Sequence, residues 1–195
     1  MNTTATVEPT GRASPRLRAR IAGAVYLLVF VAGGYALLFV PGRAIANLVA
    51  TVCYVAVTLL FYDLFKPVSR KLSLLAALVS LLGCVFGALS SFRLAPFGIN
   101  PLVFFGIYCL LIGYLVFQST FLPRFLGVLM AIGGLGWLTF LSPSLAQSLS
   151  PYNLAPGILG ELSLTLWLVV KGVDTQRWYE QAGAAARWIP AHDVA

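Results

Sequence analysis

One acidic side chain lies deep inside a strongly apolar segment of this sequence, and it is the strongest candidate for chemistry. Glu161 occurs about two turns into the segment 155–173, with Gly157 four residues before it and Thr165 four residues after it. Residues four apart share one face of a helix, so a small residue and a hydroxyl flank the carboxyl group. An acidic group at mid-span costs ~2.5–3.5 kcal/mol, so such groups usually face a bundle interior or a cavity.

The residues leave two roles open for Glu161. In the first it is a structural staple, hydrogen-bonded to another helix or paired with Arg93, which ends an earlier apolar segment at the same side of the membrane. In the second it binds a ligand or a proton, or it is a catalytic general acid or base. Further candidates for a binding site are Thr165, Asn47, Tyr54 and Tyr108. The alternative for those side chains is ordinary hydrogen bonding between helices.

Metal and cofactor chemistry is not expected. The three cysteines all lie inside apolar segments without a C-x-x-C spacing, and His192 is the single histidine. A zinc or haem site needs ligands that this sequence does not bring together. Asp63 lies at the inner end of the second apolar segment and is three residues from Lys66, which indicates an ion pair at the membrane surface.

Six apolar segments must position these side chains. Each is near the ~20 residues that cross ~30 Å of hydrocarbon at ~1.5 Å per residue, although the last three are short. Only 10% of the residues are charged and 59% are hydrophobic, whereas soluble domains carry about 25% charged residues. The composition therefore indicates an all-α, polytopic membrane protein with six transmembrane helices. The predicted spans are 20–40, 45–64, 72–92, 101–117, 125–141 and 155–173.

The basic residues indicate the orientation of these spans. Eleven of the 13 lysines and arginines lie before or at the start of the first span, at or after the end of the last one, or in the second and fourth connections. Only Arg43 and Arg93 fall on the other side. Because basic loops stay in the cytoplasm, both termini are predicted to be cytoplasmic. The net charge of +7 is spread over the ends of the spans, so nucleic acid is not an expected partner.

The chain is predicted to have three parts. Residues 1–19 form a disordered, basic cytoplasmic leader, and residues 20–173 form the six-helix transmembrane domain. Residues 174–195 form a cytoplasmic tail in which Asp174 is a candidate N-cap for a short interfacial helix that contains Trp178.

Glycines with helical spacing indicate where helices approach one another closely. Gly83 and Gly87 form a G-x-x-x-G pattern, and Gly127 and Gly134 share another face. These faces suit contacts within the bundle, and they are also candidates for a homo-oligomer interface. The other expected partners are the lipid bilayer and a small amphiphile, a cation or a proton.

Several stretches taken together resemble a known family. They are 20–28, 67–70, 74–77, 104–115, 121–129, 133–137 and 159–172, with Leu-Pro-Arg at 122–124 and Gly-Glu-Leu at 160–162 as the most specific parts. The resemblance covers roughly residues 20 to 173 and is to the bacterial domain-of-unknown-function 4386 family of six-helix integral membrane proteins. It implies a fold and a place in the bacterial inner membrane, because that family has no established activity. It also implies a shared role for Glu161.

Three functions fit these observations. The first is a non-enzymatic protein with a small polar pocket around Glu161 that binds, senses or passes a cation, proton or amphiphile. The second is an intramembrane enzyme for a lipid or isoprenoid, with Glu161 as general acid or base, loosely analogous to membrane terpene cyclases. The third is a membrane scaffold or partner subunit in which Glu161 only fixes the packing.

Overall fold

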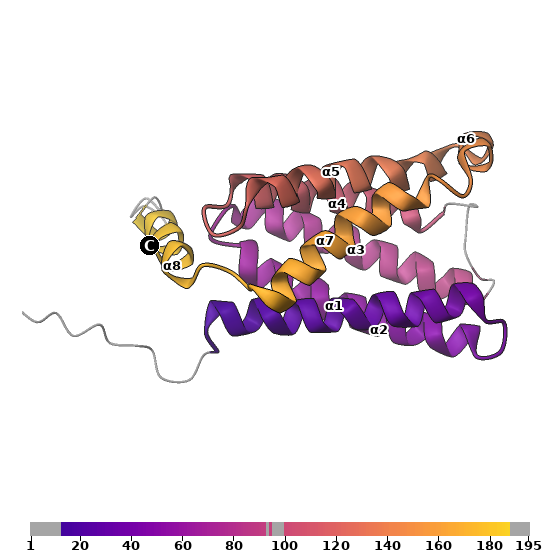
Figure 1. The fold of residues 1–195 in the computed structure, drawn as a ribbon, viewed down its shortest axis with the longest axis horizontal. Helices are drawn as coiled ribbons and strands as arrows, with labels where there is room; N and C mark the ends of the chain where they lie inside the picture. The colour runs from indigo at the N-terminus through magenta and orange to yellow at the C-terminus, as the bar shows by residue number, and fades with distance from the viewer. Residues whose placement is uncertain (1–12, 93, 95–99, 188–195) are drawn as a thin grey trace, which may run out of the picture.

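A computed structural model describes residues 13–92, 94 and 100–187 of this chain, and long helices dominate that part (Figure 1). Eight α-helices and one short 3₁₀ helix, η2, follow one another with short connections among these residues. Their bounds are α1 Pro15–Leu38, α2 Arg43–Phe65, α3 Arg70–Ser91, α4 Leu102–Gln118, α5 Arg124–Leu138, η2 Thr139–Leu141, α6 Pro143–Leu149, α7 Leu154–Val170 and α8 Thr175–Arg187.

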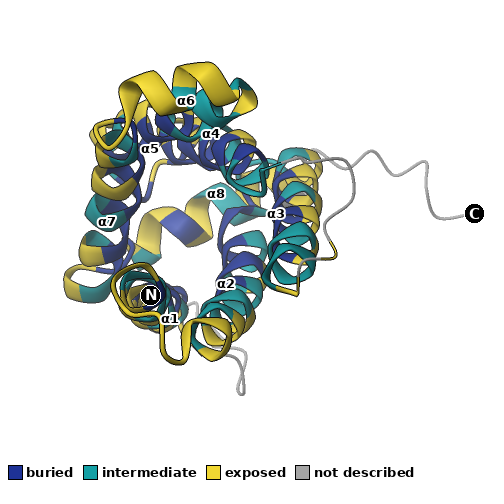
Figure 2. Cartoon of the chain, turned by 90° about the vertical axis from the view of Figure 1, so that its right-hand side faces the viewer, coloured by how far each residue is buried: buried dark blue, intermediate teal, exposed yellow. Residues whose placement is uncertain are grey.

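The six longer apolar helices form a closed ring. Helix α1 packs on α2, α2 on α3, α3 on α4, and α4 on α5. Helix α5 then packs on α7, and α7 packs back on α1, which closes the ring (Figure 2). Short connections make chain neighbours antiparallel, as in other helix bundles. Gly23 of α1 allows the ring to close, because a Cβ there would lie only 2.8 Å from the backbone nitrogen of Val169 on α7.

Buried residues of all six helices face the interior of the ring (Figure 2). Many of the exposed residues on its outside are large and apolar. The largest fully buried ones include Tyr26, Phe61, Tyr108, Met130 and Leu164. On the outer surface Val31, Val52 and Leu135 are 60–64% exposed. A soluble bundle would place polar residues there, so the apolar exterior indicates a lipid environment.

The lengths and composition of the helices indicate a membrane protein, but fewer helices meet the criteria for a membrane span than the six predicted. By length and composition α1, α2, α3 and Arg124–Leu141 can each cross a membrane. The pair α6 and α7, bent by 81° at the break between them, would make a fifth span. The helix α4 is apolar but only 17 residues long. By these criteria the described residues contain four candidate membrane spans, or five if the bent pair counts as one.

The first helix begins earlier than the sequence pattern suggested. Pro15 is its first residue, and the Ser14 hydroxyl accepts a hydrogen bond from the backbone N–H of Leu17 at 3.3 Å. Serine as N-cap followed by proline is a strong start signal for a helix. Residues 15–19, which we assigned to the leader, are therefore helical. The remainder of the leader up to residue 12 lies outside the described residues.

The glycine faces form contacts between helices of this same chain. A Cβ on Gly127 or Gly134 of α5 would lie 2.5 Å and 2.7 Å from backbone carbonyl oxygens of α4. A Cβ on Gly83 of α3 would lie 2.9 Å from the Cβ of Phe104, also on α4. Both predicted oligomer faces thus pack against α4 of the same chain, and only the surroundings of Gly87 are more open, with Pro101 at 4.0 Å.

The tail forms α8, which lies across one end of the ring (Figure 1). Asp174 caps it, since its carboxylate accepts a hydrogen bond from the backbone N–H of Arg177 at 3.1 Å. The indole of Trp178 is 9% exposed and donates to the carbonyl of Leu64, at the end of α2, at 2.9 Å. This contact docks α8 on the bundle.

Replacing Trp178 by phenylalanine is expected to loosen this docking. The ring stays apolar, but the Leu64 carbonyl loses its indole donor, which costs about 1 kcal/mol. Amide hydrogen exchange in α8 should become faster while exchange in α2 is unchanged. Tyr179→Phe is the matched control, because Tyr179 is 51% exposed. Equal exchange in both variants would contradict this docking contact.

Candidate functional site

Glu161 lies on the inner face of α7, near the middle of the bundle. It is 6% exposed, and polar side chains from four other helices surround it. Tyr26 and Tyr54 are near the midpoints of α1 and α2, Cys109 is on α4, and Trp137 is close to the end of α5. The carboxyl group therefore faces the interior of the ring, as an acid within a membrane-spanning helix should.

Both carboxylate oxygens of Glu161 accept hydrogen bonds. The Tyr26 hydroxyl donates to Oε2. The Trp137 indole N–H donates to Oε1 at 2.5 Å, and the Cys109 thiol lies 3.5 Å from the same oxygen. Each donor comes from a different helix, so one side chain of α7 is tied to α1, α4 and α5. We call Glu161, Tyr26, Tyr54, Cys109 and Trp137 the carboxylate cluster.

Tyrosine hydroxyls extend the carboxylate cluster toward α2. The hydroxyl oxygens of Tyr26 and Tyr54 are 3.3 Å apart, and their rings meet edge to face with centroids 5.5 Å apart. The ring of Tyr108 also lies against Tyr54, at 5.9 Å between centroids. The Tyr108 hydroxyl is buried and has no hydrogen-bond partner among the described residues. Two of the predicted binding residues, Tyr54 and Tyr108, thus lie beside Glu161.

The local sequence around Glu161 makes room for the indole. A Cβ on Gly157 would overlap the ring of Trp137, so only glycine lets that ring reach Glu161 one turn further along α7. Thr165, one turn beyond Glu161, is fully buried, and its hydroxyl donates to the backbone carbonyl of Glu161 at 2.8 Å. The small face predicted around Glu161 therefore takes Trp137 rather than an open space.

Two other predicted residues do not join the carboxylate cluster. Asn47 lies near the start of α2, where it lines a cavity of about 270 Å³ with Gly33 and Arg43. Arg93, the proposed partner of Glu161, lies outside the described residues. In the described part, ion pairs involve Asp63 and Asp174, both near helix ends, and none reaches Glu161. The predicted pair of Asp63 with Lys66 is confirmed at 2.6 Å.

Sequence reasoning missed Tyr26, Cys109 and Trp137. Tyr26 carries the one hydroxyl in the middle of its apolar helix, which is a usable signal for an inward-facing residue. Cys109 is one of the three cysteines inside apolar segments, where a thiol usually packs as a small apolar side chain. Nothing in the spacing of Trp137 indicates a carboxylate partner, since its contact depends on how α5 is rotated against α7.

Two cavities lie at opposite ends of the ring, one near Asn47 and the other beside α8, and Glu161 lines neither of them. Within the described residues no group of three or more histidine, cysteine or acidic side chains could hold a metal ion. A carboxyl group among hydroxyl, thiol and indole groups can, as a matter of chemistry, take up and release a proton.

Comparisons with known proteins give a family but no activity. A family model described as "Domain of unknown function (DUF4386)" matches residues 97–172, which include Cys109, Trp137 and Glu161. A protein of Archaeoglobus fulgidus described as "Uncharacterized protein" is 33% identical over 132 residues, which is 60% of this chain and 76% of the relative. No solved structure matches this chain.

Proposed function

This chain belongs to the DUF4386 family, and from that premise we propose that it is a cell-membrane protein with six spans and two cytoplasmic termini that binds a proton at Glu161. The bound proton serves sensing or permeation. The family description names no activity, so the support comes from the geometry of the carboxylate cluster.

The ring supports six crossings. The helices α4 and α7 have 17 residues each, about 25 Å at ~1.5 Å per residue, which is close to the ~30 Å of the hydrocarbon layer. Both pack side by side with helices long enough to cross. A ring in which only some members cross would leave apolar outer faces in water. The end with α8 also carries most of the basic residues, which favours the cytoplasm for that end.

The proposal rests on the groups that donate hydrogen bonds to the Glu161 carboxyl group. An indole N–H can only donate, so Oε1 must remain an acceptor toward Trp137. A proton therefore binds at Oε2, on the side of Tyr26. The Tyr26 hydroxyl then accepts from Glu161 and turns its own proton toward Tyr54. Binding of one proton thus reorganises hydrogen bonds between α7, α1 and α2.

Glu161→Gln tests this proposal, because glutamine resembles the protonated acid and cannot titrate. In lipid nanodiscs the intrinsic tryptophan fluorescence of the wild type should change between about pH 4 and about pH 9, since Trp137 contacts the titrating group. Glu161→Gln and Trp137→Phe should each abolish that change. Asp63→Asn, which removes an acid at the end of α2, should preserve it. An unchanged pH profile in Glu161→Gln would refute proton binding at this site.

A flux assay separates permeation from sensing. In proteoliposomes with an enclosed pH-sensitive dye, a permeation role predicts that the wild type collapses an imposed pH gradient and Glu161→Gln does not. A sensing role predicts the fluorescence change without collapse of the gradient. Both outcomes keep proton binding at Glu161, and the absence of both effects would reject it.

A scaffold is the second candidate, and the saturated hydrogen bonds of Glu161 favour it. A scaffold predicts that Glu161→Gln changes only the stability or assembly of the protein. The lipid- or isoprenoid-directed enzyme has less support. Its acid and hydroxyls lie at one depth, but Glu161 lines neither the cavity near Asn47 nor the one beside α8.

A further inference from the structure

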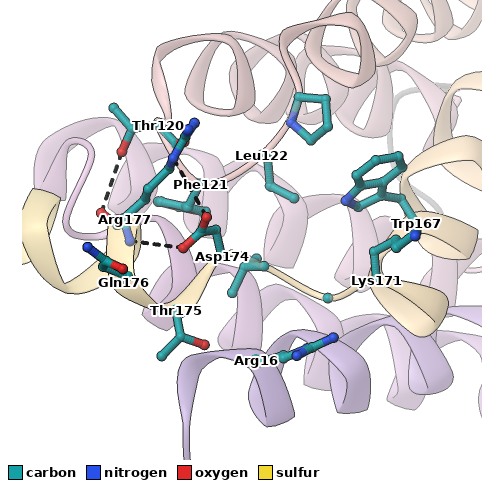
Figure 3. A pocket seen from close by; sticks show the side chains of 13 residues that line it. Arg16, Thr120, Phe121, Leu122, Trp167, Lys171, Asp174, Thr175, Gln176 and Arg177 are labelled. Carbon is teal, nitrogen blue, oxygen red and sulfur yellow. Dashed lines mark hydrogen bonds and ion pairs between the residues drawn. The ribbon is translucent and has the colours of Figure 1, made fainter.

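A second polar feature lies at the α8 end of the bundle, far from the carboxylate cluster. It is a cavity of about 590 Å³ between the start of α1, the end of α7, the beginning of α8 and the turn before α5 (Figure 3). The side chains that line it include Arg16, Thr120, Trp167, Lys171, Asp174 and Arg177. We call it the basal cavity.

The basal cavity carries excess positive charge. Arg16, Lys171 and Arg177 line it, against the single acid Asp174. Arg177 is already engaged, since it lies 3.6 Å from the Asp174 carboxylate and donates to the Thr120 carbonyl at 3.4 Å (Figure 3). Arg16 and Lys171 form no ion pair within the part of the chain that the structure describes. Two positive charges therefore remain for an anion.

The backbone places the turn after Lys171 against the stem of Arg16. Gly172, with φ +70°, turns the chain directly after Lys171. A Cβ at Gly172 would lie 2.9 Å from Cγ of Arg16, so the turn lies against the stem of that side chain. Arg20, one turn further along α1, donates to the carbonyl of Val170 at 3.0 Å. The end of α7 is thus tied to α1 beside the cavity.

The first turn of α8 adds polar groups. Thr175 and Gln176 line the cavity at the beginning of this 13-residue helix. The Asp174 carboxylate already caps this turn by accepting from the backbone N–H of Arg177. The charge available to an anion therefore comes mainly from the side chains of Arg16 on α1 and Lys171 at the end of α7.

An apolar surface continues from the cavity along the outside of the bundle. The ring of Trp167, which lines the cavity, meets the ring of Phe125 edge to face at 5.8 Å between centroids. Phe125 is 53% exposed and Val170 is 62% exposed. An anionic lipid matches this arrangement, because its charged headgroup fits the basic cavity and its acyl chains fit the adjoining apolar surface. A soluble anion would gain nothing from the apolar part.

We propose that the basal cavity binds the phosphate headgroup of an anionic phospholipid. Arg16 and Lys171 contact the phosphate, and the acyl chains lie along Phe125 and Val170. Lysine and arginine near an anionic membrane surface each strengthen binding by about fivefold, so two of them give roughly 30-fold. This site is independent of the proton bound at Glu161.

The test compares phosphatidylglycerol with phosphatidylcholine, each added to the full chain in detergent and counted on the protein by native mass spectrometry. The wild type should retain phosphatidylglycerol preferentially. Arg16→Gln combined with Lys171→Gln should weaken that retention roughly 30-fold. Arg70→Gln is the matched control, because Arg70 is exposed at the start of α3, at the same end, and does not line the cavity.

Charge-conserving and soluble-anion experiments complete the test. Arg16→Lys combined with Lys171→Arg should keep the preference, which separates lost charge from lost folding. Inorganic phosphate should compete poorly, because it lacks acyl chains. Equal loss in the Arg70→Gln control, full retention in the double glutamine variant, or efficient competition by inorganic phosphate would each overturn the proposal.

Discussion

Gly127→Leu is expected to separate α4 from α5 and to destabilise the bundle by about 3 kcal/mol, the upper part of the range for overpacking. A Cβ at this position would lie 2.5 Å from the carbonyl oxygen of Gly113 and 2.8 Å from the backbone nitrogen of Phe117. Both atoms belong to the helical backbone of α4, which cannot yield as a flexible side chain can. The midpoint of unfolding by SDS in detergent micelles measures the loss.

The matched control for this variant is Gly34→Leu on α1. A Cβ on Gly34 would meet no atom within 4 Å, so the added side chain points into open space. Its expected effect is near zero or slightly stabilising, because leucine favours a helix over glycine. Equal destabilisation of both variants would mean that α4 and α5 do not approach as closely as the structure shows.

Tyr26→Phe is expected to have the second largest effect, a loss of about 2 kcal/mol. Hydrogen bonds between membrane helices contribute ~0.6 kcal/mol on average. This one contributes more, because its removal leaves Oε2 of the buried Glu161 carboxyl without its donor. Phenylalanine keeps the ring contacts of Tyr26 with Phe30 and Phe61. The SDS unfolding midpoint again gives the stability, and Glu161→Gln should reduce the effect because the two residues are coupled.

Tyr35→Phe is the control on the same helix. Tyr35 is 45% exposed and donates to the carbonyl of Pro41 at 3.2 Å, so its hydroxyl is lost at little cost. If Tyr26→Phe were no more harmful than Tyr35→Phe, the Tyr26 hydroxyl would contribute nothing to holding Glu161. The pH-dependent fluorescence would then have to arise without the tyrosine pair.

The two variants examine different kinds of contact in the ring. The glycine pairs Gly113–Gly127 and Gly106–Gly134 bring two backbones together without polar side chains. The carboxylate cluster instead joins helices through a few directional hydrogen bonds. Under the proposal above, protonation of Glu161 rearranges only the second kind of contact, the hydrogen bonds between α7, α1 and α2. The glycine contacts between α4 and α5 stay unchanged.

Parts of the fold and of the candidate site could be predicted from the sequence. The apolar segments around positions 20–40, 45–64 and 72–92 overlap α1, α2 and α3, because a run of apolar residues near 20 long has few alternatives to a helix in lipid. The inward position of Glu161 follows from the same physics. Tyr54 and Tyr108 were selected for their polar groups at middle depth, and both lie near Glu161.

The composition and spacing of this chain determined that apolar helices form and that the acid among them turns away from lipid, since each depends on local periodicity and solvation alone. Tertiary structure decided which donors reach the acid. Tyr26 is 135 positions from Glu161 in the sequence, and Trp137 reaches it only because residue 157 has no side chain. Such contacts depend on how six helices rotate and close into a ring, and no spacing within one helix encodes that rotation.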